Sequence, residues 1–337
     1  MGVGTSGARH PLIALLGATG FVGSAVLREL AGRDVRIRAV ARHRAAVPAG
    51  ARAAIEVMEA DLTEPGASAA AVEGADVIVH AVLYSAATST WRVEHGDTAA
   101  ERVNVGLVRD LVTALEQRGG PLRTVVFAGA ASQVGPCGKD VLDGSETDAP
   151  RGEYDRQKLA AERLLLDADR RGVLHGVSLR LPTVFGPGHG SAARDRGVVS
   201  AMARRALAGE PITMWHDGTI RRDLLYVDDL ARAVVAAIDH AEALAGRHWL
   251  LGTGARTPLG PVFEQVADLV GERTGKERVA VCCVAPPDHA EAGDFTSVTI
   301  DSTAFRSVTG WAPQVPLVAS LRRTVDALAA ETDRGRR

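Results

Sequence analysis

Long apolar runs and cysteine are both scarce in this chain of 337 residues. No apolar run approaches the roughly 20 residues that a membrane-spanning helix needs, and residues 1–10 lack the apolar core of a secretory signal. The three cysteines, Cys137 and the adjacent Cys282 and Cys283, have neither zinc-ligand spacing nor the pattern of a disulfide framework. We therefore expect a cytoplasmic protein with no metal site and no membrane partner.

The chain also has little excess charge of either sign and few aromatic residues. The formal net charge of −2 provides no general field for holding nucleic acid, so we expect no nucleic-acid partner. Any anionic ligand must be bound by local groups. Aromatic residues make up 4% of the chain and hydrophobic residues 46%, so Ala, Val and Leu must fill a packed interior.

Short apolar segments alternate with amphipathic segments over the first half of the chain. The apolar segments have no polar face, which is typical of parallel strands covered by helices on each side. The pattern predicts strands at residues 11–16, 35–40, 56–62, 76–83, 123–129 and 176–182, and helices at residues 24–33, 101–119 and 154–172. This order predicts an α/β fold with a doubly wound parallel sheet of the Rossmann type.

The stretch TVFGPGHG, at residues 183–190, is rich in Gly and Pro and marks the expected crossing into a smaller lobe. The later segment LLYVDDLARAVVAAIDHA indicates a return to the sheet and its covering helices. We expect a sheet domain at residues 11–184 with a return segment at about 225–252. Residues 185–224 and 253–330 are then expected to form a C-terminal substrate-binding lobe.

The segment GATGFVG joins the first predicted strand to the first predicted helix. Gly17 permits a tight turn, Gly20 lets the backbone approach a pyrophosphate, and Gly23 lets the helix pack close to the sheet. The helix N-terminus would then face the phosphates. The residues that we expect to contact a nicotinamide dinucleotide here are Gly17, Thr19, Gly20, Phe21, Val22 and Gly23.

The end of the second predicted strand bears on the choice between NAD and NADP. An NAD site usually has a carboxylate there, which accepts from the adenosine ribose hydroxyls, but this chain has Ala41, Arg42, His43 and Arg44. A guanidinium at this position can pair with the 2′-phosphate of NADP. Arg42 therefore favours NADP(H), and the alternative is a solvated basic turn.

Three further strand ends supply candidate cofactor contacts. Asp61 is placed to accept from the adenine amino group and Leu62 to cover the ring, although a strand-end Asp is often only structural. Ala81 follows His80 at the end of the fourth predicted strand, and we interpret His80 as structural. Pro182, at the end of the sixth predicted strand, completes the expected contacts.

Tyr154 and Lys158 are four residues apart and therefore lie on one face of a predicted helix. A free tyrosine has a pKa near 10, and a neighbouring ammonium lowers it by favouring the phenolate. In a ketone reduction Tyr154 would protonate the forming alkoxide, and Lys158 would tune Tyr154 and hold the nicotinamide ribose. The pattern also occurs on exposed helices, but its place after the glycine turn favours catalysis.

Seven motifs occur in order along the chain: GATGFVG, ADL, VIVHAV, VNVGLVRDL, VVFAGAASQVG, YDRQK and RLPTVFGPG. On these motifs the chain resembles the extended short-chain dehydrogenase/reductases, the NAD-dependent epimerase/dehydratase family, from about residue 12 to residue 328. The segments RRDLLYVDDLARA and SVTIDSTAFRSVTGW are similar to the family's lobe and closing segments. The resemblance therefore covers both expected lobes.

Within that family, four segments are most similar to ketoreductases that reduce C4 of nucleotide-linked 4-keto-6-deoxysugars: FAGAASQVG, YDRQKLAAE, LRLPTVFGPG and EPITMWHDGTIRRDLLYVDD. Those enzymes make deoxysugars for natural-product glycosylation, as in antibiotic biosynthesis. The resemblance implies NADPH as cofactor, a dTDP-4-keto-6-deoxyhexose as substrate and a homodimer formed through a four-helix interface.

Ala130 departs from the family pattern, which places a catalytic Ser or Thr at this position. The nearest hydroxyl is that of Ser132, which would point to the same side as Ala130 if the segment kept a strand-like period. We expect Ser132 to join Tyr154 and Lys158 as a catalytic residue that orients the carbonyl, and Ser132 and Gln133 to contact the substrate. The alternative is that Ser132 bonds only to backbone.

The residues at positions 42, 131 and 132 also bear on whether the chain is a reductase, a dehydratase or an epimerase. Family dehydratases carry an Asp-Glu pair where this chain has Ala131 and Ser132, so dehydration is disfavoured. Family epimerases recycle a tightly held NAD, whereas Arg42 favours NADP. We predict net C4 reduction with an exchanging NADPH. The alternatives are a nucleotide-sugar 4-epimerase with bound NAD and a non-catalytic NADP-binding module, and the presence of Tyr154 and Lys158 argues against the module.

Arg222 matches the family arginine that grips the substrate diphosphate, a task suited to a forked guanidinium. The alternative is a salt bridge with Asp223 or Asp229. A second family arginine is replaced by Glu291, which implies either a difference in nucleotide recognition or that another arginine, such as Arg256, supplies the charge. Asn104 matches a helix asparagine that supports the geometry of the family's active site.

Overall fold

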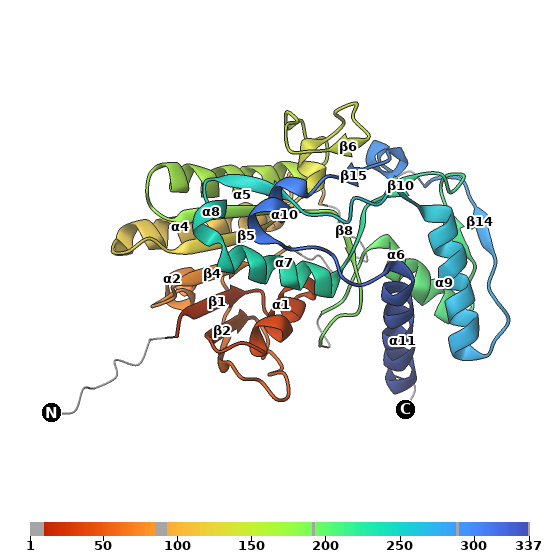
Figure 1. The fold of residues 1–337 in the computed structure, drawn as a ribbon, viewed down its shortest axis with the longest axis horizontal. Helices are drawn as coiled ribbons and strands as arrows, with labels where there is room; N and C mark the ends of the chain where they lie inside the picture. The colour runs from red at the N-terminus through yellow and green to blue at the C-terminus, as the bar shows by residue number, and fades with distance from the viewer. Residues whose placement is uncertain (1–9, 85–92, 191–192, 288–289, 336–337) are drawn as a thin grey trace.

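The computed structural model describes residues 10–84, 93–190, 193–287 and 290–335. Figure 1 shows a main sheet with helices packed around it and a smaller group of helices at the other side of the molecule. In the four described ranges, no helix combines the length and the apolar character needed to cross a membrane.

Seven parallel strands form the main sheet, in the order β12, β7, β5, β4, β1, β2, β3. Because every neighbouring pair is parallel, the chain must return across the sheet between strands, and it does so mostly through helices. The strands are β1 (Leu12–Leu16), β2 (Arg36–Ala41), β3 (Ala54–Glu59), β4 (Val77–His80), β5 (Thr124–Ala130), β7 (His175–Leu181) and β12 (Arg247–Leu250).

Side chains of β1 alternate between two buried faces of the sheet. Ile13 and Leu15 belong to one hydrophobic cluster, whereas Leu12, Ala14 and Leu16 belong to another. A strand that is apolar on both faces needs a layer of helices on each side. The doubly wound α/β fold predicted from the sequence is therefore confirmed.

Helices supply both covering layers. They are α1 (Phe21–Ala31), α2 (Ala67–Ala71), α3 (Thr98–Glu101), the π-helical turn η1 (Arg102–Gly106), α4 (Leu107–Arg118), α5 (Glu153–Arg170), α7 (Val227–Asp239), α8 (Ala241–Leu244) and α10 (Thr303–Thr309). The cluster that contains Ile13 lies under α1 and α7, which pack against each other, and the cluster that contains Leu12 lies under α4 and α5. Figure 1 shows these two pairs of helices on different sides of the sheet.

A third hydrophobic cluster forms the core of the smaller helical part. It is built from α6 (Val198–Leu207), α9 (Leu259–Thr274) and α11 (Leu317–Gly335). Phe305 and Trp311, which precede α11, pack instead in the cluster under α1 and α7. Residues 253–330 therefore contribute to both parts, and the domain limits drawn from the sequence stay a prediction.

Four short strand pairs border the smaller part and the edge of the sheet. The segment expected to return to the main sheet first forms β11, which pairs with β8, and the chain rejoins the main sheet only at β12. The pairs are β8 (Thr183–Phe185) with β11 (Leu224–Tyr226), β9 (Ile212–Met214) with β14 (Val281–Cys283), β10 (Arg221–Arg222) with β13 (Thr257–Pro258), and β6 (Val141–Leu142) with β15 (Thr299–Ile300).

The order of the strands places a topological switch between β1 and β4. The chain leaves β1 for β2 on one side, while β4 pairs with β1 on the other. Ligands of open α/β sheets bind outside the carboxyl ends of the strands at such a point. Gly17 follows β1 and Ala81 follows β4, so both lie at the switch.

Candidate active site

The glycine turn after β1 is shaped by the absence of side chains. Gly17 has a φ of +87°, and a Cβ there would lie 2.9 Å from the carbonyl oxygen of Ala81. A Cβ on Gly23 would lie 2.0 Å from the carbonyl oxygen of Gly17. Gly20 precedes the first residue of α1 and donates its N–H to the Gly17 carbonyl at 2.9 Å. The turn therefore fits the close approach of a pyrophosphate to a helix N-terminus.

Arg42 and Asp61 lie at the carboxyl ends of the next two strands. Arg42 directly follows β2 and is exposed. Asp61 Oδ1 accepts from the N–H and the hydroxyl of Thr63, at 2.9 and 2.7 Å. These two hydrogen bonds lower the pKa of Asp61, and the charge of Arg42 lowers it further. The edge thus presents a guanidinium and an ionised carboxylate close to each other.

The remaining residues predicted at the cofactor lie along the same edge. Thr19, Phe21 and Val22 are half-buried in and after the glycine turn, and Pro182 is half-buried between β7 and β8. The side chain of Leu62 is buried in the cluster under α4 and α5. Its contact with an adenine ring stays a prediction, as do the contacts of the other four.

Lys158 reaches from α5 to the ends of β4 and β5. Its Nζ donates to the carbonyl oxygen of Ala128 at 2.5 Å and lies 4.6 Å from the centre of the Phe127 ring. His80 also contacts that ring, with 5.7 Å between the ring centres, and is buried; neither of its ring nitrogens has a hydrogen-bond partner within the described residues. Burial, helped by the charge of Lys158, lowers the pKa of His80 to about 3. His80 is therefore a neutral group in the core.

The acidity of Tyr154 differs from the expectation. Burial raises its pKa above the usual range, and the neighbouring carboxylate of Asp155 raises it further. We expected the ammonium of Lys158 to lower this pKa, but the loss of solvent around the phenol dominates. Burial also lowers the pKa of Lys158, to about 8. Tyr154 consequently keeps its proton at neutral pH and is suited to donate it.

Asn104 fastens the helix that carries these two residues. It is buried in the π-helical turn η1, a type of helix that often marks functional sites. Its Oδ1 accepts from the N–H of Tyr84 at 2.9 Å, and its Nδ2 donates to Gln157 Oε1 at 2.8 Å. Gln157 directly precedes Lys158. Asn104 thus ties the segment after β4 to the face of α5 beside Lys158.

The segment after Ala130 does not keep the strand period that we assumed. β5 ends at Ala130 and the chain enters a 3-10 turn, η2 (Ala131–Val134). Ser132 is exposed there, and its Oγ donates to Asp155 Oδ1 at 2.6 Å. Gln133 is buried, and its Oε1 accepts from the N–H of Ala130 at 2.7 Å. Gln133 therefore holds the end of the strand through its Oε1, and its contact with the substrate stays a prediction.

The sequence reasoning missed Asp155. It lies between Tyr154 and Lys158 in YDRQK, where a charged residue in the first turn of the helix was the available signal. Burial raises the pKa of Asp155 to about 6. A carboxyl group that titrates near neutrality therefore lies directly beside the predicted proton donor.

Arg222 makes neither of the salt bridges considered as alternatives. Its guanidinium donates to backbone carbonyls of the segment around η3 (Ala292–Phe295), among them Gly293 at 2.8 Å and Asp294 at 3.0 Å, and also Thr296. Burial lowers its pKa. Backbone carbonyls orient the guanidinium and the charge of Asp294 acts on it, and a guanidinium held in this way suits an anionic ligand.

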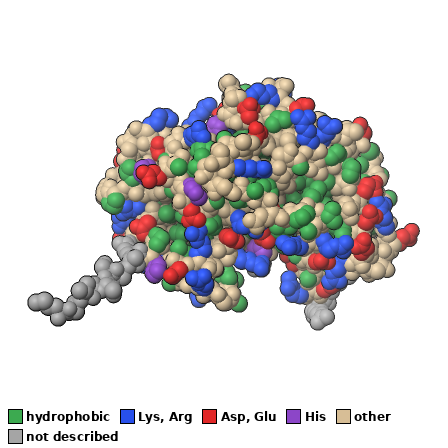
Figure 2. Space-filling model, viewed as in Figure 1, with side chains coloured by type: hydrophobic (Ala, Val, Ile, Leu, Met, Phe, Trp, Pro, Cys, Tyr) green, Lys and Arg blue, Asp and Glu red, His purple; other side chains and the backbone are tan. Residues whose placement is uncertain are grey.

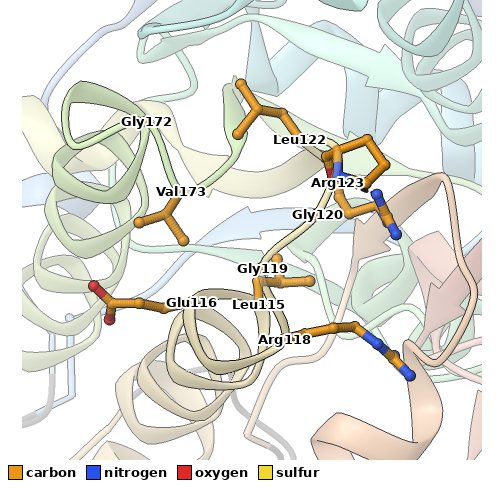
Figure 3. A pocket seen from close by; sticks show the side chains of 10 residues that line it. Leu115, Glu116, Arg118, Gly119, Gly120, Leu122, Arg123, Gly172 and Val173 are labelled. Carbon is orange, nitrogen blue, oxygen red and sulfur yellow. Dashed lines mark hydrogen bonds between the residues drawn. The ribbon is translucent and has the colours of Figure 1, made fainter.

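Other features of the surface lie away from this site. The pocket in Figure 3 is formed where α4 ends and β5 begins, at the opposite edge of the sheet from the glycine turn. Acidic and basic side chains are interspersed over the face shown in Figure 2. In the part of the chain that the structure describes, no group of three or more His, Cys, Asp or Glu side chains is placed to hold a metal ion.

Several curated proteins are similar to this chain along most of its length. A dTDP-6-deoxy-L-talose 4-dehydrogenase (NAD(P)(+)) from Kitasatospora kifunensis is 29% identical over 319 residues, 92% of this chain and 93% of that protein. A dTDP-L-rhamnose 4-epimerase from Burkholderia thailandensis is 24% identical and is covered over 96% of both chains. A 3beta-hydroxysteroid-dehydrogenase/decarboxylase isoform 2 from Arabidopsis thaliana is 22% identical over 82% of this chain, which spans only 52% of that relative.

Solved structures share the fold. MoeE5 in complex with UDP-glucose and NAD superposes with a TM-score of 0.75 at 27% identity, over 97% of this chain and all of that one. RMD from Pseudomonas aeruginosa, complexed with NADPH, superposes with a TM-score of 0.74 at 19% identity, over 96% of this chain and all of that one. Residues 13–252 match the model of the NAD dependent epimerase/dehydratase family. The chain therefore belongs to the NAD dependent epimerase/dehydratase family.

Proposed function

We propose that this enzyme reduces the C4 ketone of a dTDP-4-keto-6-deoxyhexose with NADPH, in the biosynthesis of deoxysugars for natural-product glycosylation. The observation that carries the proposal is the pair Tyr154 and Lys158, one turn apart on α5, with the Lys158 Nζ reaching the Ala128 carbonyl oxygen in β5. The similarity to a dTDP-6-deoxy-L-talose 4-dehydrogenase over 92% of the chain supports the substrate class.

Each proposed catalytic residue has one task. The nicotinamide cofactor supplies hydride when bound. Tyr154 donates its proton to the oxygen that becomes the alkoxide, because an alkoxide is a stronger base than a phenolate. Lys158 stabilises the negative charge left on Tyr154 and holds the nicotinamide ribose. Ser132 donates to the carbonyl oxygen and orients it.

Arg42 supports NADPH over NADH. It is exposed at the end of β2, where a family member specific for NAD would carry an acidic residue. Arg222 supports a diphosphate-linked substrate, since its guanidinium is oriented by backbone carbonyls and not neutralised by a carboxylate in direct contact. We therefore propose that Arg42 binds the 2′-phosphate of NADPH and that Arg222 binds the diphosphate of the substrate, since a positive charge suits each of these anions.

A nucleotide-sugar 4-epimerase is the second candidate. Its support is the similarity to a dTDP-L-rhamnose 4-epimerase over 96% of both chains. An epimerase oxidises and reduces the same sugar carbon and retains NAD between turnovers. A module that binds NADP without turnover is disfavoured because Tyr154 and Lys158 are both present.

We also propose that the enzyme is a homodimer, formed through α4 and α5. A shallow depression between these helices is lined by charged residues of both signs and by apolar ones, and we propose that Arg163 of one copy pairs with Asp167 of the other across a two-fold axis there. Sedimentation velocity tests this: we expect a dimer for the natural chain and dissociation for Arg163→Glu, and a natural chain that stays monomeric at every concentration contradicts it.

The decisive experiment for the reaction offers NADPH and NADH separately with a dTDP-4-keto-6-deoxyhexose and identifies the configuration at C4 of the product. We expect oxidation of NADPH only when the ketone is present, one equivalent per sugar reduced. If the purified protein instead retains NAD and interconverts two nucleotide sugars with no net cofactor consumption, the epimerase is the correct assignment.

A further inference from the structure

Ser132 and Asp155 form a hydrogen-bonded pair beside the proposed proton donor. The Ser132 Oγ lies 2.6 Å from Asp155 Oδ1, a short distance for a hydroxyl and a carboxylate. Asp155 follows Tyr154 in the first turn of α5, and Ser132 lies two residues beyond Ala130, where the family hydroxyl is missing. The pair thus joins the turn after β5 to the first turn of α5, beside the proposed proton donor.

The direction of this hydrogen bond limits what Ser132 can do. A serine hydroxyl has one hydrogen to donate and an ionised carboxylate can only accept. While Asp155 is ionised, it receives the hydrogen of Ser132, and the carbonyl of a substrate must compete for it. When Asp155 is protonated, its own O–H can donate to Ser132 Oγ, and the hydrogen of Ser132 is released to the carbonyl.

The surroundings of Asp155 favour its protonated form. A Cβ placed on Gly152 would lie 3.1 Å from Asp155 Oδ2 and 3.7 Å from Glu291 Oε2, so the two carboxylates converge on one point. Burial and the charge of Glu291 together raise the pKa of Asp155 to about 6, against the opposing effects of Ser132 and Arg156. Arg156 is itself bound to Glu153 Oε2, at 2.9 Å, which weakens its hold on Asp155.

We propose that Asp155 is a positioning residue that sets the direction of the Ser132 hydrogen bond, so that Ser132 donates to the substrate carbonyl only when Asp155 carries a proton. The proposal rests on the ketone reduction proposed above. No proton leaves the pair during turnover: hydride reaches the carbonyl carbon, the proton of Tyr154 reaches the carbonyl oxygen, and Ser132 and Asp155 keep theirs.

The pH dependence of reduction by Asp155→Asn tests this proposal. In the natural enzyme, kcat should fall as pH rises through the titration of Asp155, since above a pKa the protonated fraction drops about tenfold per pH unit. An asparagine amide can always donate to Ser132. We therefore expect Asp155→Asn to match the natural kcat within about threefold at low pH and to exceed it about thirtyfold at pH 7.5, with KM nearly unchanged in both.

Two variants serve as comparisons. Ser132→Ala should lower kcat by about ten- to a thousandfold at low pH. It should also abolish the fall in kcat that the titration of Asp155 causes in the natural enzyme. Glu242→Gln changes an exposed carboxylate on α8 and should reproduce the natural profile. If Asp155→Asn keeps the natural pH dependence, or if Ser132→Ala has no effect, the proposal is wrong.

A measurement without substrate separates this proposal from the proposed function. Carbon-13 NMR follows the titration of the Asp155 carboxyl, assigned by the signal that Asp155→Asn removes. Because donation from Ser132 stabilises the ionised form, Ser132→Ala should raise the pKa of Asp155. If the titration is unchanged, the pair does not form and the proposal fails, even where ketone reduction is found. If the pKa of Asp155 rises but neither the natural enzyme nor any variant reduces a ketone at any pH, the proposed function is wrong. The role of Asp155 in positioning Ser132 for ketone reduction is then wrong as well.

Discussion

Arg180 of β7 and Glu162 of α5 are joined by two buried hydrogen bonds, from Arg180 Nε to Glu162 Oε2 at 3.1 Å and from Arg180 Nη2 to Glu162 Oε1 at 2.5 Å. Both side chains are about 2% exposed or less. Asp148 and Ser178 complete the network, at 2.7 Å and 2.6 Å from their partners. Since Glu162 is one turn beyond Lys158, this network fixes the height of the catalytic helix above the sheet.

Replacing Arg180 by Met should destabilise the protein by about 3–5 kcal/mol, because two carboxylates, those of Glu162 and Asp148, are left without their counter-charge. Urea unfolding followed by circular dichroism measures this. Arg170→Met is the matched control, since Arg170 and Asp167 form an exposed pair, and it should cost less than about 1 kcal/mol. Equal losses for the two variants would show that the buried network does not stabilise the fold.

Gly23→Ala should weaken binding of the dinucleotide by about ten- to a hundredfold. The added methyl group would lie 2.0 Å from the carbonyl oxygen of Gly17, so the turn must open to admit it. Fluorescence titration with NADPH checks this. Gly32→Ala, at the other end of α1, has its nearest neighbour at 3.7 Å and should bind normally. Normal binding by Gly23→Ala would place the cofactor elsewhere.

Arg42→Ala should weaken binding of NADPH by about ten- to a hundredfold and leave NADH binding within about threefold, because only NADPH has a 2′-phosphate for the guanidinium. Isothermal titration with each dinucleotide gives both affinities. Arg52→Ala, an exposed arginine in the loop before β3, should change neither. A parallel loss for the two cofactors, or none, would mean that Arg42 does not select between them.

Loss of the Lys158 charge should lower the rate of reduction above pH 8. Burial lowers the pKa of Lys158 to about 8, so the side chain is an ammonium below that pH and a neutral amine above it. Only the ammonium stabilises the oxygen of Tyr154 after proton donation. The effect is best measured as kcat against pH in Asp155→Asn, because this variant should lack the fall in kcat that the titration of Asp155 causes at lower pH. The variant Lys158→Met should show no fall in kcat above pH 8. If the fall persists in this variant, it is caused by the titration of another group.

The sequence predicted the parts of this fold that local patterns determine. Apolar segments between glycine-rich turns gave the strands, because burial on both faces leaves no room for polar residues. GATGFVG located the turn at the switch point, because the close contacts of Gly17 and Gly23 tolerate no side chain. Each of these features depends on residues adjacent in the chain.

Tertiary packing decided what the sequence could not predict. The pKa of Tyr154 depends on burial, which the YDRQK spacing does not report. Ser132 meets Asp155 only because β5 ends at Ala130 and the chain turns. The partners of Arg222 are about 70 residues away in the chain, on a segment with no motif of its own. Such contacts follow from the folded arrangement of distant segments.

The central claim is that Tyr154 donates the proton that completes a ketone reduction. Its most direct test is the oxidation of NADPH in the presence of a dTDP-4-keto-6-deoxyhexose, in one turnover, by the natural enzyme and by Tyr154→Phe at equal cofactor saturation. We predict stoichiometric oxidation by the natural enzyme and a rate lower by at least about a hundredfold in Tyr154→Phe, with unchanged NADPH affinity. Equal rates in the two proteins would contradict the claim.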